Sequence, residues 1–60
     1  DPVTRIAALY AVGTLRGDAG DTAGARVELE RMIEEAKRYG GNTGVAYYVD
    51  LAKKLLAGMD

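Results

Sequence analysis

Apolar residues recur every three to four positions along three stretches of the chain, and glycine-rich segments separate these stretches. This spacing is typical of amphipathic α-helices, which bury one face and expose the other. It predicts helices over about residues 2–16, 22–39 and 44–58. Because both connections are short, consecutive helices should be antiparallel. We therefore predict an all-α, up-down-up three-helix bundle that forms a single domain over residues 1–60.

Residues with helix-capping side chains precede each of the predicted helices. Asp1 is followed by Pro2, which suits a first helical position because its missing N–H would be unpaired there. Asp21 or Thr22 can cap the second helix, and residues 42–43 offer caps for the third. These signals agree with the periodicity on where the helices begin.

The second and third stretches each carry one continuous apolar face. The second face comprises Ala25, Leu29, Met32, Ile33 and Ala36, and the third comprises Val45, Tyr48, Val49, Ala52, Leu55, Leu56 and Met59. Tyr10, Tyr39 and Tyr48 should supply the aromatic bulk of the core, since their rings pack while their hydroxyls reach water. On the polar face of the second helix, residues of opposite charge are four apart, so we expect ion pairs such as Arg31–Glu35.

The first predicted helix is unusually apolar. One face contains Val3, Ile6, Tyr10 and Gly13. Val12 and Leu15 lie away from that face, and the simplest interpretation is a central helix that is covered on two sides. The alternative is that Val12 and Leu15 border a partner-binding surface, or a surface through which the chain associates with itself.

The composition excludes the commonest catalytic and metal-binding arrangements. The 60 residues include no Cys, His, Ser, Gln, Phe or Trp. Without Cys, Ser or His, the usual nucleophile and base pairs, disulfides and thiolate metal sites are all impossible. We therefore expect a non-enzymatic protein with no cofactor of its own. The restricted alphabet of aliphatic residues and strong helix formers is typical of a de novo designed miniprotein, although a GC-rich genome gives a similar bias.

The charge balance and hydropathy also restrict the partners. Eight Lys and Arg against nine Asp and Glu give a net charge of −1, whereas proteins that bind nucleic acid carry a basic excess. No apolar run approaches the roughly 20 residues that cross a bilayer, so we expect no membrane insertion. No charged-then-apolar leader is present, so we expect no signal peptide in this chain.

One tripeptide in the first connection is not explained by turn formation. Arg16-Gly17-Asp18 resembles the RGD cell-adhesion motif of fibronectin, vitronectin and many disintegrins. We expect it in an exposed loop over about residues 16–21, held at both ends by helices. The resemblance implies binding to an integrin ectodomain of the fibronectin-receptor or alpha-v class. The protein would then act outside the cell, and we expect it to be a monomer.

The resemblance also implies a role for each residue of this tripeptide. Arg16 would pair with acidic residues of the receptor α-subunit, because a guanidinium binds carboxylates through paired hydrogen bonds. Asp18 would complete a Mg²⁺ or Mn²⁺ site that belongs to the receptor β-subunit. Gly17 would be the spacer at the subunit junction. Additional contacts that select among integrins would come from Val12, Leu15 and Ala19.

Two alternatives remain open at this point. Asp18 could instead cap the second helix, whose N-terminal amides attract carboxylates, and its oxygens would then be occupied. The tripeptide could also be incidental on a structural or interaction module. Residues 25–58 resemble one helix–turn–helix unit of a tetratricopeptide-like array.

Overall fold

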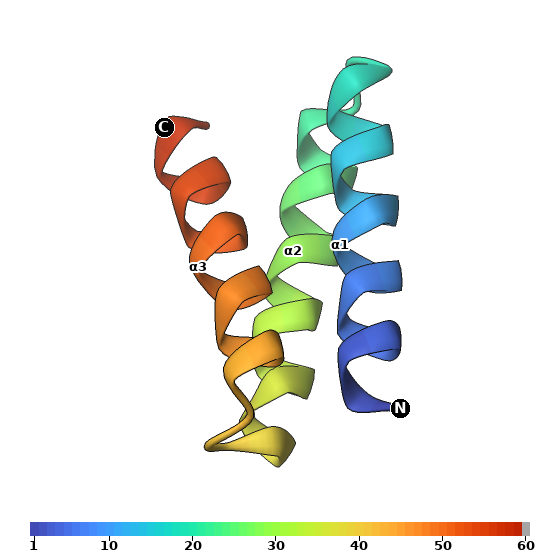
Figure 1. Ribbon diagram of the computed structural model, residues 1–60. Helices are drawn as coiled ribbons and strands as arrows, with labels where there is room; N and C mark the ends of the chain where they lie inside the picture. Colours follow the sequence, from blue (N-terminus) through green and yellow to red (C-terminus); the bar gives the residue numbers. More distant parts are fainter. Residues whose placement is uncertain (60) are drawn as a thin grey trace.

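The computed structural model describes residues 1–59, which form three α-helices that run up, down and up (Figure 1). Helix α1 spans Pro2–Asp18, α2 spans Thr22–Ala36 and α3 spans Thr43–Gly58. A short 3-10 helix, η1, covers Lys37–Tyr39. The predicted all-α three-helix bundle is confirmed, and the second predicted helix is divided between α2 and η1.

Each α-helix begins directly after a residue whose side chain accepts a hydrogen bond from the first turn. These caps are Asp1, Asp21 and Asn42, all of which the sequence offered as candidates. Asp21 makes the shortest of the three bonds, 2.8 Å from its Oδ1 to the Gly24 amide. Because losing such a cap typically costs about 1 kcal/mol, these side chains determine where the helices start.

Helix α1 extends two residues further than predicted and ends in a Schellman turn. Gly20 adopts a left-handed conformation with φ +89°. Its amide donates to the Gly17 carbonyl at 3.0 Å, and the Asp21 amide donates to the Arg16 carbonyl at 2.9 Å. This pair of bonds satisfies carbonyls that a helix end otherwise leaves free. The predicted loop over residues 16–21 is therefore wrong: residues 16–18 are helical, and only residues 19–21 connect α1 to α2.

The centre of the core is provided by α2, which contributes more fully buried residues than α1 or α3. The buried apolar residues are Ile6, Ala25, Leu29, Met32, Ala36, Val45 and Ala52. Tyr10, Tyr39 and Tyr48 pack against this cluster while half-buried, as predicted. Helix α1 approaches α2 closely at Gly13, where a Cβ would lie only 2.7 Å from Leu29 Cδ2.

The outer face of α1 is open to solvent, so α1 is not the central helix that its composition suggested. Leu15 is 67% exposed and Val12 is 40% exposed. Helix α1 has more apolar side chains than its two neighbouring helices can cover, so some of them remain exposed to solvent. Both side chains are therefore accessible, as the alternative interpretation of a partner-binding surface bordered by Val12 and Leu15 requires, and that interpretation stays a prediction.

An ion pair between helices replaces one of the pairs expected within α2. Arg5 Nε on α1 donates to Glu35 Oε1 on α2 at 2.8 Å. The predicted Arg31–Glu35 pair is therefore wrong, and Arg31 Nη1 lies 3.7 Å from Glu28 Oε1 instead. Glu35 faces α1 rather than the next turn of its own helix. The spacing of charged residues along α2 could not predict this, because it contains no information about the residues of α1.

Glu35→Gln is expected to reduce the loss of stability that acid causes. The hydrogen bond from Arg5 holds the pKa of Glu35 below its ordinary value of 4.5. The stabilisation from this ionised carboxylate is complete above the unfolded-state pKa and is lost as pH falls through the lower folded-state pKa. Urea midpoints should differ between wild type and variant at about pH 7 and converge at about pH 3. A difference that persists in acid would contradict this origin.

Candidate functional site

The tripeptide of residues 16–18 lies exposed at the end of α1, beside the turn into α2 (Figure 1). Successive residues of an α-helix are rotated by about 100°, so side chains two positions apart project in nearly opposite directions. Arg16 is accordingly on the side of α1 that meets α2, and Asp18 is on the side that faces α3. The two charged groups are thus separated across the helix end.

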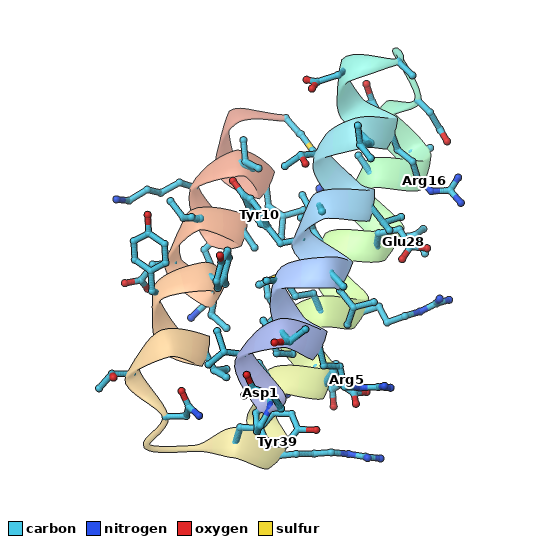
Figure 2. All side chains as sticks on the ribbon, turned by 45° about the vertical axis from the view of Figure 1, so that its right-hand side comes forward. Asp1, Arg5, Tyr10, Arg16, Glu28 and Tyr39 are labelled. Carbon is cyan, nitrogen blue, oxygen red and sulfur yellow. The ribbon has the colours of Figure 1, made fainter. Side chains whose placement is uncertain are left out.

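Arg16 forms an ion pair with the residue that caps the next helix. Its Nη1 lies 3.3 Å from Asp21 Oδ2, and both side chains are 49% exposed. Figure 2 shows the Arg16 side chain extending away from the ribbon at the edge of the bundle. Solvent screens an ion pair of this kind, so the guanidinium can exchange its partner for another carboxylate at a cost of at most about 1 kcal/mol.

Asp18 lies at the rim of a hollow of about 340 Å³ between α1 and α3. The hollow is lined by Gly13, Thr14, Gly17, Asp18, Leu29, Lys54, Leu55, Gly58 and Met59. Among residues 1–59, no hydrogen bond or ion pair involves the Asp18 carboxylate. Since Asp21 provides the cap of α2, the alternative in which Asp18 caps that helix is wrong.

The position of Asp18 is electrostatically unfavourable. The C-terminal end of a helix carries partial negative charge, which disfavours an anion there by about 0.3–1 kcal/mol and favours a cation. Arg16, in the same turn, follows this rule and Asp18 does not. No cation in the described part of the chain forms an ion pair with Asp18, and the Lys54 side chain lines the same hollow. Residues that break a local rule are expected at functional sites.

Gly17 does not use the conformational freedom that its role as a spacer suggested. It is helical, and positive φ values occur at Gly20 and Gly41 instead. A Cβ on Gly17 would lie 3.6 Å from the Ala25 Cβ, which is an ordinary contact. The fold itself therefore has no steric need for glycine at this position.

An apolar strip, called here the outer strip, runs along the exposed face of α1. Its members are Ala8, Ala11, Val12, Leu15 and Ala19, all of them exposed. By rotation about the helix axis, Leu15 and Ala19 fall between Arg16 and Asp18. Val12, Leu15 and Ala19 thus share one open face, with Arg16 and Asp18 at its two edges, and Gly17 lies outside it.

Two further residues belong to this site: Asp21, which the sequence predicted as a helix cap at the far end of the loop but not as a partner of Arg16, and Gly24, which it did not connect with the tripeptide. The two carboxylate oxygens of Asp21 have different partners: Oδ1 accepts from the Gly24 amide and Oδ2 faces Arg16. A Cβ on Gly24 would lie 2.6 Å from Asp21 Cγ, so the absence of a side chain leaves room for this carboxylate. The sequence contained one signal for this role of Gly24. Glycine is less favourable than alanine in a helix by about 1 kcal/mol, so a glycine in the first turn indicates that a side chain there would be in the way.

No protein-family model, curated protein or solved structure matches this chain. The functional assignment consequently depends on the chemistry of its own residues. None of the helices within residues 1–59 combines the length and apolar character that crossing a membrane requires. In the same residues, no three acidic, histidine or cysteine side chains gather where they could hold a metal ion.

Proposed function

We propose that this protein binds an integrin ectodomain through Arg16, Gly17 and Asp18 on the last turn of α1. The observation that carries the proposal is the exposed Asp18 carboxylate, which has no partner among residues 1–59 and follows Arg16-Gly17 as in the RGD motif. Unoccupied carboxylate oxygens are the ligands that Mg²⁺ and Mn²⁺ prefer. Asp21 supports the proposal because, by capping α2, it leaves those oxygens available.

The opposite projections of the two charged side chains suit a receptor with two subunits. Arg16 would form paired, charge-assisted hydrogen bonds with carboxylates of the α-subunit. Asp18 would complete the coordination of the metal ion that the β-subunit holds, so this chain needs no metal of its own. These roles follow from the resemblance to the RGD motif, and the exposure of both side chains is compatible with them.

The surrounding structure would contribute to affinity in two ways. The Schellman turn fixes the backbone of residues 16–18, so less conformational entropy remains to be lost on binding. Val12, Leu15 and Ala19 of the outer strip would add apolar contacts that select among receptors. We infer a receptor of the fibronectin-receptor or alpha-v class, bound outside the cell by a monomer.

Asp18→Glu is expected to weaken integrin binding at least about tenfold, which corresponds to about 1.4 kcal/mol. The charge is retained, but the added methylene moves the carboxylate away from the metal. Dissociation constants would be measured against an immobilised integrin ectodomain in Mn²⁺, with thermal melting followed in parallel. Asp50→Glu, the same change at an exposed position of α3, is the control and should bind like wild type.

Chelation of divalent cations tests the same contact independently. Binding of the wild type should disappear in EDTA and return when Mn²⁺ is restored. If Asp18→Glu bound as well as wild type, or if binding survived EDTA, the metal bridge would be rejected. The tripeptide would then be incidental on a helical interaction module.

A further inference from the structure

We propose that Asp21 competes with the receptor for Arg16 and thereby lowers the affinity of the site; this inference rests on the proposed function. Asp21 Oδ2 lies 3.3 Å from Arg16 Nη1 in the unbound protein. A partner that recognises a guanidinium does so with an anionic oxygen, most effectively a carboxylate. Asp21 and the partner therefore require the same group.

The structure keeps the Asp21 carboxylate close to Arg16 in three ways. Its Oδ1 accepts the hydrogen bond that caps α2, 2.8 Å from the Gly24 amide. Its backbone amide donates to the Arg16 carbonyl at 2.9 Å, which joins the two residues through the Schellman turn. Gly24 has no side chain to displace the carboxylate. Asp21 cannot turn away from Arg16 without losing the cap.

The charge of Asp21 also opposes the approach of the partner. Its side chain is 49% exposed, so a carboxylate that approaches Arg16 meets a second negative charge a few ångströms away. Like charges placed together across an interface reduce affinity and slow association. From the usual energy of an exposed ion pair, removal of this charge is expected to tighten binding by about two- to five-fold.

Asp21→Asn is the direct test, because asparagine caps helices as well as aspartate but carries no charge. Glu35→Gln is the matched control: it also removes one negative charge and one arginine ion pair, at Arg5 near the other end of α1 (Figure 2). Affinity for an integrin ectodomain would be measured in Mn²⁺ at about 0.05 M and about 0.5 M NaCl. We expect tighter binding by Asp21→Asn at low salt, a smaller difference at high salt, and no change in affinity for Glu35→Gln.

A second variant, Asp21→Ser, also keeps a capping oxygen and should act like Asp21→Asn if charge is the cause. Binding by both variants that is equal to or weaker than wild type would overturn the competition and leave the proposed function intact. If Glu35→Gln tightened binding as much as Asp21→Asn, the cause would be the change in net charge, and the proposed competition by Asp21 would also be overturned. If the wild type failed to bind any RGD-binding integrin in Mn²⁺, both proposals would be rejected.

Discussion

Gly17→Ala is expected to stabilise the fold while it weakens integrin binding. Gly17 is helical, and its added Cβ would meet only the Ala25 Cβ at 3.6 Å. Alanine is favoured over glycine inside a helix by about 1 kcal/mol. The free energy of unfolding, measured in urea by far-UV circular dichroism, should therefore rise by up to about 1 kcal/mol.

Since the fold tolerates this methyl group, any loss of affinity reports a requirement of the receptor. Glycine allows close approach of a partner and backbone conformations that alanine avoids. The added methyl group faces Ala25, so it weakens binding only where the receptor requires residue 17 to leave its helical conformation; alanine opposes that change by about 1 kcal/mol, which is about five-fold in Kd. Gly40→Ala is the control, because open space surrounds Gly40, which follows η1 in the connection to α3, and binding should not change. Unaltered binding by Gly17→Ala would argue against recognition of the RGD type.

Leu29→Ala is expected to cost about 2–5 kcal/mol of stability. Leu29 is fully buried at the centre of α2, where Gly13 lets α1 approach it closely. A domain of 60 residues has a total stability of roughly 3–9 kcal/mol. The variant should therefore lose most of its cooperative unfolding transition, because the neighbouring backbone cannot close the cavity completely.

Val27→Ala, two residues earlier on the same helix, is the matched control for Leu29→Ala. Val27 is 53% exposed, and its truncation should change stability by less than about 0.5 kcal/mol. The midpoints of urea denaturation of the two variants would be compared under the same conditions. Similar midpoints for the two would mean that Leu29 is not the centre of the core.

The helices and their starting points could be predicted because the signals are local. A cap such as Asp1 or Asn42 acts within three residues, and a helical period repeats within one segment. The end of α1 was predicted less well. Arg16-Gly17 suggested a break, but the left-handed residue is Gly20, three positions later. Both glycines can end a helix, and only the backbone hydrogen bonds around them distinguish the two.

Contacts between helices could not be predicted, because the sequence pattern within one helix does not show which residues of another helix it will meet. The apolar content of α1 indicated how much surface could be buried, but Val12 and Leu15 lie on a face that no neighbour covers. Glu35 had possible partners on its own helix, and it pairs with Arg5 on another. In both cases the outcome depends on how α1 and α2 are placed against each other.

For the candidate site, the amino-acid sequence alone determined which chemical groups exist and in what order: a guanidinium, a glycine and a carboxylate beside a helix start. It left two aspartates as possible caps for that helix. The tertiary structure decided between them, because the turn at Gly20 places Asp21 over the first amides of α2 and leaves Asp18 exposed. Two chemically identical carboxylates thus differ in whether they accept a hydrogen bond, because hydrogen bonding depends on position in space as well as on residue type.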